Sequence, residues 1–299
     1  MPTSTPDRPD LFDTGHYATS LGQRLRRGFE LGPKYYLFDV PRYLRQRRRL
    51  QLPVMDWPAL WNPVRSFLGT TYLKLPLPPH YDEALEQLRG AGVQFANPRH
   101  RTEALVGLWW QVRDIAGDVI ECGAYRGATS LLLAVLGRLN GLSQRVLMLD
   151  TFAGMPAPSE YDSSRHPGEF APPSGWTAVI AEQIAALDLT GRAEIHAGLF
   201  ADSFAVLEAR NPRFAFAHID ANIFEGTRDA CAFTLPRMAA GGAVVFDDYN
   251  GLCDLGARLA IDAAMAETER SSEARDRRNT MPGTARPLPL AECSAYLRT

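Results

Sequence analysis

Residues 119–130, VIECGAYRGATS, decide how the rest of this chain is interpreted. An apolar run gives way to Gly123 and Gly127 and then to helix-forming residues, which is the pattern of a strand, a tight turn and a helix N-terminus. Open α/β sheets bind nucleotide-like ligands above such turns, because glycines let the backbone approach and the helix start presents N–H groups. The sequence therefore predicts a ligand site at this turn.

The glycine spacing and a neighbouring acid narrow the choice of ligand. Gly123 and Gly127 are four positions apart, so the G-x-G-x-x-G pattern of dinucleotide-binding turns is not met and a dehydrogenase is disfavoured. Glu121 lies inside the apolar strand, where an unpaired buried carboxylate is costly. We expect Glu121 to meet a cation or several hydrogen-bond donors, and a ligand ammonium group would serve.

The composition is that of a globular protein that acts on a small molecule. The 299 residues are 45% hydrophobic and 22% charged, which suits one large α/β domain with an accessory segment. The formal net charge of -2 gives no electrostatic reason to expect nucleic acid. The four cysteines lack CxxC or zinc-ligand spacing, so reduced core thiols and a cytoplasmic location are expected. No long apolar run or signal-peptide core is visible, so neither a membrane span nor secretion is predicted.

We predict an accessory, mainly helical segment over residues 1–100, loose over its first 20 residues or so, and a larger domain over residues 101–299. Residues 42–49 mix arginines with Tyr43 and Leu44. Such a segment could lie on an acidic lipid surface or grip phosphates, but mixed charge on a helix most often marks a solvated face. Solvation is therefore the preferred interpretation of this segment.

Beyond residue 101 the chain alternates between helical and strand patterns. Thr102 is a candidate N-cap of a helix over residues 102–116, whose apolar stripe includes Trp109 as a core residue and which Gly117 should end. Expected strands span residues 119–121, 145–150, 193–196, 214–220 and 242–247. Expected helices lie between them over residues 128–139, 178–187, 204–209 and 227–238. A helix over residues 255–269 and one or two strands within residues 288–297 are expected to follow. Strict alternation implies a parallel sheet with helices on both faces.

Aspartates stand where three of these strands end: Asp150 on the second, Asp220 on the fourth, and Asp247 with Asp248 on the fifth. Ligands of open α/β sheets bind beyond the carboxyl ends of the strands, so Asp150 is placed to bind ribose hydroxyls, with a capping or surface role as the alternative. Asp220, Asp247 and Asp248 end the fourth and fifth strands, and three acids in one cleft raise one another's pKa unless a cation shares the site. They therefore predict Mg²⁺ or another hard ion such as Ca²⁺ or Mn²⁺, unless one of them points away into a cap or salt bridge.

His218 precedes Asp220 by two residues and so shares its face of the strand. Two roles fit this position. His218 could accept a proton from the substrate, or it could be a neutral histidine that is hydrogen-bonded beneath the site. The second role is somewhat preferred.

Five stretches, taken in order, show that the chain resembles the macrocin O-methyltransferase (TylF/MycF-like) family of S-adenosylmethionine-dependent sugar O-methyltransferases. They are VIECGAYRGATS, LDTFAGMPAPSEYD from Leu149, HAGLFADSF from His196, HIDANIFEGT from His218 and GGAVVFDDYNGLCDLGARLAID from Gly241. The resemblance runs from about residue 102 to the C-terminus. It implies a class I methyltransferase fold, a Rossmann-like, mostly parallel seven-stranded sheet with helices on both faces, and a homo-oligomer that methylates a hydroxyl of a natural-product glycoside.

The same resemblance implies roles for individual residues. The turn at residues 121–127 would hold the methionine part of S-adenosylmethionine, with Asp150 on the ribose and Asp202 near the adenine. The implied donor-binding residues are Glu121, Gly123, Tyr125, Gly127, Ser130, Asp150, Phe152, Asp202 and Ser203. The implied Mg²⁺ ligands are Asp220, Asp247 and Asp248, with Asp220 or His218 taking the proton of the acceptor hydroxyl.

Two positions depart from the family pattern. Asn222 stands where the family usually has a second acid, and residues 223–227 read IFEGT where the family has Leu-Tyr-Glu-Ser-Thr. These departures leave open a donor-binding subunit without catalysis. A catechol-type O-methyltransferase acting on an aromatic diol is a second alternative, because such enzymes use similar metal chemistry.

Residues 153–175 form a Pro-, Gly- and Ser-rich stretch that is too long for an ordinary connection. We expect this segment to close over the donor, with Tyr161 and Asp162 near the acceptor.

Overall fold

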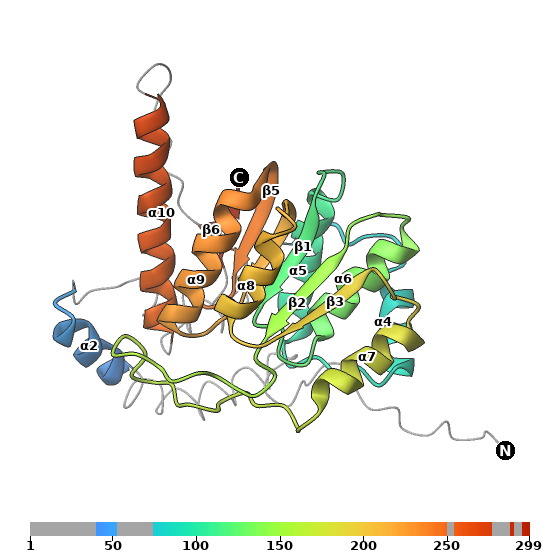
Figure 1. Cartoon of the computed structure of the whole chain (residues 1–299), viewed down its shortest axis with the longest axis horizontal. Helices are drawn as coiled ribbons and strands as arrows, with labels where there is room; N and C mark the ends of the chain where they lie inside the picture. The colour runs from blue at the N-terminus through green and yellow to red at the C-terminus, as the bar shows by residue number, and fades with distance from the viewer. Residues whose placement is uncertain (1–39, 53–73, 250–253, 277–287, 290–294) are drawn as a thin grey trace.

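A mixed sheet forms the centre of the structure, a computed structural model that describes residues 40–52, 74–249, 254–276, 288–289 and 295–299. Its seven strands follow the order β3-β2-β1-β4-β5-β7-β6 (Figure 1). The strands are β1 (Asp118–Cys122), β2 (Val146–Asp150), β3 (Ala193–Ala197), β4 (Phe214–Ile219), β5 (Met238–Phe246), β6 (Leu288–Pro289) and β7 (Ala295–Arg298). Expectations for residues 1–20, Cys253 and Cys293 lie outside the described residues.

The first five strands are parallel and the last two are antiparallel to their neighbours. The mostly parallel sheet expected from the sequence is therefore confirmed. The strand order reverses between β1 and β4, because the chain first adds β2 and β3 on one side of β1 and then crosses to the other. Ligands of such sheets bind in the crevice at this reversal, beyond the carboxyl ends of the strands.

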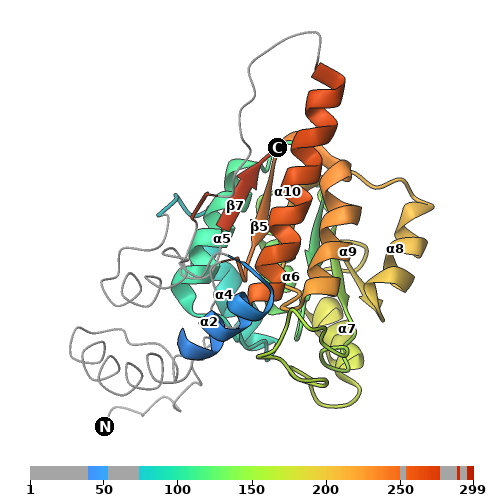
Figure 2. The same ribbon diagram turned by 90° about the vertical axis from the view of Figure 1, so that its left-hand side faces the viewer.

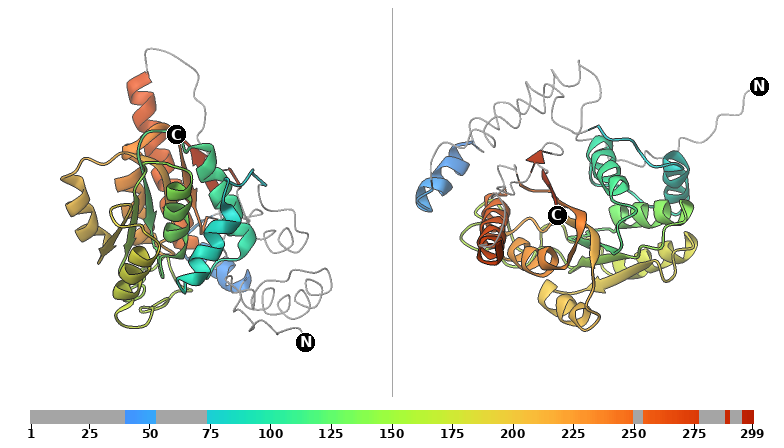
Figure 3. Two further views of the ribbon diagram at one scale, coloured as in Figure 1. Left: turned by 90° about the vertical axis from the view of Figure 1, so that its right-hand side faces the viewer. Right: turned by 90° about the horizontal axis from the view of Figure 1, so that it is seen from above.

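Helices cover both faces of the sheet, as the end-on view of Figure 3 shows. One face packs against α4 (Tyr81–Gly90), α5 (Arg99–Gln111), α6 (Ala128–Leu139) and α7 (Trp176–Ala186), the other against α8 (Phe200–Glu208), α9 (Phe224–Thr234) and α10 (Leu255–Asp276). The residues of β2 divide between the two cores, Val146 and Met148 on one side and Leu147 and Leu149 on the other. This is the two-residue period of a strand that is buried on both faces.

Helix α5 differs at both ends from the sequence expectation. It begins at Arg99 with Pro98 as its N-cap, whereas Thr102 lies inside the helix and donates its hydroxyl to the Pro98 carbonyl at 3.4 Å. Thr102 is therefore not the N-cap, since proline itself fits at a helix start, where no N–H is needed. The helix ends at Gln111, well before Gly117. Trp109 is 1% exposed, which confirms it as a core residue.

Other helices also differ from the expected bounds: α7, α8 and α9 begin two, four and three residues earlier than expected, at Trp176, Phe200 and Phe224. Helix α9 stops at Thr234 and continues as the 3₁₀ turn η3 (Leu235–Arg237), because Pro236 cannot donate the next helical hydrogen bond. Helix α10 continues to Asp276, so residues 271–276, which lie beyond the helix expected over residues 255–269, are helical as well. Helix α6 has the expected bounds.

The described part of the N-terminal hundred residues joins the main fold. Leu85 and Leu88 of α4 belong to the same core as α6. Figure 2 shows α2 (Val40–Arg49) beside the start of α10, where Tyr43 packs on Leu255. The division into two domains at residue 100 stays a prediction.

The arginine-rich segment forms α2, and its charged groups have two environments. Arg42, Arg45 and Arg48 are exposed or half-buried, as a solvated helix face requires. Arg47 is buried and donates to the Tyr43 hydroxyl at 3.2 Å. Among the described helices, none has the length and apolar character needed to cross a membrane.

Candidate functional site

The turn after β1 is pressed against the end of β4. Gly123 has φ +97° and its backbone lies so close to the Asp220 carbonyl that a Cβ at position 123 would be 1.8 Å from that oxygen. The Asp220 N–H donates to the Cys122 carbonyl at 2.8 Å. Only glycine fits here, because both the space and the positive φ exclude a side chain. The turn over residues 121–127, called the donor turn from here on because it is the one expected to hold the methyl donor, is thus held beside Asp220 at the end of β4.

Glu121 is satisfied inside the protein. It is 3% exposed, and its Oε2 accepts the backbone N–H of Ser130 at 3.1 Å and the Ser130 hydroxyl. Its Oε1 lies 2.8 Å from Nδ1 of His218. The expected donors are therefore Ser130 and His218, and a ligand ammonium group is not required to balance this carboxylate.

His218 is 1% exposed and lies between two acids. Its Nδ1 contacts Glu121, and its Nε2 is 3.9 Å from Oδ1 of Asp247. Burial lowers the pKa of His218, but the interactions with Asp247 and Glu121 outweigh burial and raise the pKa to about 10. His218 is therefore an imidazolium at neutral pH. A charged His218 differs from the neutral histidine preferred in the sequence analysis, and its role in proton transfer stays a prediction.

Asp150, at the end of β2, is held by two backbone N–H groups. Its Oδ2 accepts from Tyr125 and its Oδ1 from Phe152, each at 2.8 Å, and both residues have positive φ. Burial raises the pKa of Asp150, and these hydrogen bonds oppose the rise. The Thr151 hydroxyl also lies 3.4 Å from Oδ1, so Oδ2 is the oxygen that keeps a lone pair for a ligand hydroxyl. The carboxylate lies beside the donor turn, as a ribose-binding acid must.

An aromatic and cationic group flanks the donor turn. The Arg126 guanidinium carbon lies 5.0 Å from the Tyr125 ring centre and 5.1 Å from that of Trp176, and Trp176 Nε1 donates to the Arg126 carbonyl at 3.3 Å. Phe170 meets the Tyr125 ring edge-on at 6.3 Å. Sequence analysis named Tyr125 but missed Arg126 and Trp176, which are 50 positions apart.

The remaining residues implied for the donor site lie nearby or on the same edge. The Gly198 N–H donates to the Asp150 carbonyl at 3.0 Å, which brings the loop before α8 next to Asp150. Within α8, Asp202 is exposed in the first turn and Ser203 is buried. Gly127 has φ +79° and precedes the first residue of α6.

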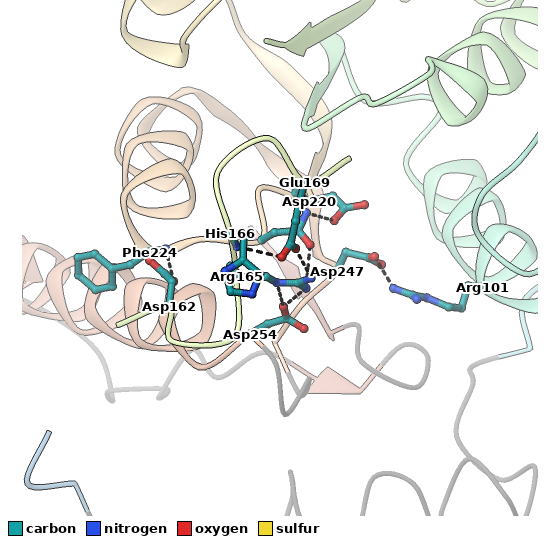
Figure 4. A network of polar contacts seen from close by, with 10 residues as sticks. Arg101, Asp162, Arg165, His166, Glu169, Asp220, Phe224, Asp247 and Asp254 are labelled. Carbon is teal, nitrogen blue, oxygen red and sulfur yellow. Dashed lines mark hydrogen bonds and ion pairs between the residues drawn. The ribbon is translucent and has the colours of Figure 1, made fainter. Parts of the chain in front are cut away.

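The acids on β4 and β5 are brought together only in part. Ligand atoms of His218, Asp220 and Asp247 all lie within 4.8 Å of one another. Burial, together with the charge of Asp247, raises the pKa of Asp220 to about 7. Asp247 also forms an ion pair with Arg101 of α5, a partner 146 positions away that sequence analysis missed. Figure 4 shows Asp247 turned toward Arg101.

Asp248 lies outside that close group but belongs to the same acidic region. It is 9% exposed, and its buried Oδ2 has no hydrogen-bond partner among the described residues. Burial raises its pKa well above the usual range, and the charges of Asp254 and Asp220 raise it further. A buried, unsatisfied carboxylate oxygen beside two further acids is what a hard cation would stabilise. The residues present therefore fit Mg²⁺.

The segment over residues 153–175 docks onto the starts of α9 and α10. Asp162 is 2% exposed, accepts from the Ser159 hydroxyl at 2.7 Å and from the Phe224 N–H at 3.0 Å, and so caps α9. The Tyr161 ring lies 4.4 Å from the Phe224 ring. The Asp162 carboxylate is buried in these contacts, and the expected position of Tyr161 and Asp162 near the acceptor stays a prediction.

A reversed parallel sheet, a glycine turn at β1 and an acid at the end of β2 define a class I S-adenosylmethionine-dependent methyltransferase. More narrowly, the chain belongs to the macrocin-O-methyltransferase (TylF) family, whose model matches residues 102–268.

Two known proteins show the extent of the similarity. A Streptomyces olivaceus protein named 8-demethyl-8-(2,3-dimethoxy-alpha-L-rhamnosyl)-tetracenomycin-C 4'-O-methyltransferase is 30% identical over 144 residues, 45% of this chain and 54% of that protein. The chain thus matches about half the length of this curated relative. The crystal structure of CalS11, a calicheamicin methyltransferase, superposes with a TM-score of 0.51 at 21% identity, covering 99% of both chains, and supports the fold.

Proposed function

We propose that this chain transfers a methyl group from S-adenosylmethionine to a hydroxyl of a sugar on a small-molecule natural product, with Mg²⁺ at the acids of β4 and β5. The single observation that carries the proposal is the closeness of Asp220 and Asp247 to the donor turn, whose Gly123 touches the Asp220 backbone. The name of the curated relative, a methyltransferase for a rhamnosyl group, supports a sugar acceptor. A homo-oligomer and a cytoplasmic location remain predictions.

In this proposal Asp220, Asp247 and Asp248 hold the metal. When bound, Mg²⁺ lowers the pKa of a coordinated sugar hydroxyl and orients it. Arg101 and the His218 imidazolium hold Asp247 in place by their charges. The buried Oδ2 of Asp248 supplies an oxygen that no described group satisfies.

The protein's remaining task is to orient the reactants and remove one proton. The S–CH₃ bond of the sulfonium breaks as the O–CH₃ bond forms, and the electron pair stays on sulfur. The hydroxyl proton passes to a carboxylate oxygen of Asp220. In the metal-free protein, burial and the charge of Asp247 raise the pKa of Asp220 to about 7, and a bound Mg²⁺ would lower that pKa. In this proposal a protonated His218 holds Glu121 and Asp247 in place.

The test is thermal stabilisation by S-adenosylhomocysteine with and without Mg²⁺, beside NAD as a control, followed by methyl transfer to glycosides and aromatic diols. We expect a rise in the unfolding midpoint with S-adenosylhomocysteine, a further rise with Mg²⁺, and turnover of glycosides that EDTA abolishes. Near wild-type turnover by Asp220→Asn and Asp247→Ala, with no effect of EDTA, would refute the metal-assisted mechanism.

Other outcomes would redirect the assignment. Preference for aromatic diols would indicate a catechol-type enzyme. Donor binding without any Mg²⁺ affinity would favour a donor-binding subunit that lacks catalysis.

A further inference from the structure

The segment over residues 153–175 places an arginine, Arg165, beside the acids that follow β4 and β5. Arg165 has a side chain that is 14% exposed, and its Nε donates to Oδ1 of Asp254 at 3.0 Å. Its Nη2 donates to Oδ1 of Asn222 at 3.0 Å and also to Asp254. Its Nη1 lies 3.4 Å from Oε2 of Glu169, within the same segment. Figure 4 shows this guanidinium beside Asp254 at the end of the sheet that carries Asp220 and Asp247.

Asn222 links Arg165 to Asp220 by hydrogen bonds. Its Nδ2 is shared between the Asp220 carbonyl at 3.4 Å and Asp220 Oδ1 at 3.5 Å, and its backbone is left-handed with φ 61°. An amide accepts through one atom and donates through another, whereas a carboxylate only accepts. The side chain that departs from the family pattern can therefore bind the arginine and Asp220 at once, which an aspartate in its place could not do.

We propose that Arg165 and Asn222 are positioning residues that orient the carboxylate of Asp220 when the segment over residues 153–175 is docked. The inference rests on the proposed function, since Asp220 is both the metal ligand and the proton acceptor there. Neither residue touches the reacting atoms. Each acts through Asp220, by a chain of hydrogen bonds that begins on the segment and ends on the acid.

Charge supports the same arrangement. Arg165 lies among Asp254, Asp248 and Asp220 and lowers the pKa values that burial raises in Asp254 and Asp248. A guanidinium suits this place, because its rigid fork reaches two acceptors at once. Removing Arg165 would leave the acids to repel one another and would release Asn222.

The same segment also reaches the donor turn. The Arg165 guanidinium carbon lies 5.4 Å from the ring centre of Phe170, whose ring meets that of Tyr125. Tyr125 in turn donates its N–H to Asp150. One segment therefore contacts both the donor turn and the acids, and its docking brings both halves of the site into one arrangement.

The experiment separates positioning from simple anchoring of the segment. Asn222→Gly removes the amide but tolerates a positive φ, and it leaves the contacts of Asp162 and Tyr161 unchanged. With S-adenosylhomocysteine bound, we expect Mg²⁺ affinity measured by calorimetry to fall about tenfold. In turnover, kcat should fall while KM for S-adenosylmethionine stays unchanged, and proteolysis of residues 153–175 should match the wild type.

Arg165 gives a second, independent pair of variants. Arg165→Met should weaken Mg²⁺ binding similarly, and Arg165→Lys should recover part of it, because the lysine keeps the charge but not the fork. Glu169→Gln is the matched control, since Glu169 contacts Arg165 without reaching Asn222, and it should bind Mg²⁺ as the wild type does.

Two results would count against the inference. Wild-type Mg²⁺ affinity and kcat in Asn222→Gly and Arg165→Met would overturn it while leaving the proposed function intact. Absence of Mg²⁺ binding in the wild-type protein would overturn the metal dependence itself, and this inference with it.

Discussion

Gly123 and Asp220 meet backbone to backbone, and a methyl group on Gly123 would lie 1.8 Å from the Asp220 carbonyl oxygen. We expect Gly123→Ala to separate β1 from β4, to lower the unfolding midpoint strongly and to abolish S-adenosylhomocysteine binding. Gly141→Ala is the control, because Gly141 also has positive φ (+69°), but a Cβ there would meet no atom of the described residues within 4 Å. It should cost only the left-handed backbone strain of about 1–2 kcal/mol. Equal losses in the two variants would show that the close approach does not matter.

The charge of His218 gives the ligand-free protein a pH-dependent stability. Its pKa is raised from 6.5 to about 10 on folding, so the stabilisation is complete below pH 6.5 and is lost as the pH rises toward 10. In His218→Gln this contribution disappears. Chemical unfolding from pH 6 to 10 should show the two proteins converging in stability as the pH rises. Parallel pH profiles, or a neutral His218 ring by NMR at pH 7.5, would contradict the assignment.

Removing Arg101 should destabilise the protein before any ligand is added. Asp247 is 9% exposed at its side chain and pairs with Arg101, while the imidazole of His218 lies 3.9 Å away. We expect Arg101→Met to lower the free energy of unfolding by about 1–3 kcal/mol, since a buried carboxylate loses one of its cationic partners. Arg99→Met, on the exposed face of the same helix, should cost less than about 0.5 kcal/mol although it breaks the pair with Glu103. Similar losses would mean that burial of the pair contributes nothing.

The affinity for S-adenosylmethionine and S-adenosylhomocysteine should depend on Asp150. The two carboxylate oxygens of Asp150 accept the backbone N–H groups of Tyr125 and Phe152. In Asp150→Asn the amide N–H₂ would face one of these N–H groups, so the side chain must turn or lose that hydrogen bond. We expect S-adenosylhomocysteine binding to weaken about 10- to 100-fold by calorimetry. Asp188→Asn, an exposed position after α7, should bind the ligand as the wild type does. Unchanged affinity in Asp150→Asn would remove this acid from the donor site.

The core of the fold could be predicted from the sequence because its elements carry strong local patterns. Helix α6 and the five parallel strands are largely apolar runs, and the aspartates that close three of the strands mark the end of the sheet where ligands bind. Helix ends were less predictable: α5 begins after Pro98 and ends well before Gly117, and α10 continues past residue 269. The C-terminal edge strands were predictable only as a range.

Long side chains that reach across the fold could not be predicted. Arg101 meets Asp247 from 146 positions away, and Arg165 meets Asp254 from 89. The sequence around an arginine does not indicate whether its side chain is buried, because buried and exposed arginines occur in similar local sequences. Likewise the hydrogen bond from the Phe224 N–H to Asp162, which was expected only to lie near the acceptor, depends on the path of the whole segment.

The stacking of Arg126 on Trp176 gives the molecule a built-in optical reporter. Trp176 is held at the donor turn by a hydrogen bond to Arg126 and by the cation above its ring, whereas Trp109 is sealed in the core. Indole emission is sensitive to nearby charge and polarity. The difference in emission between the wild type and Trp176→Phe can therefore follow events at the donor turn without an attached label, against the background of the other four tryptophans.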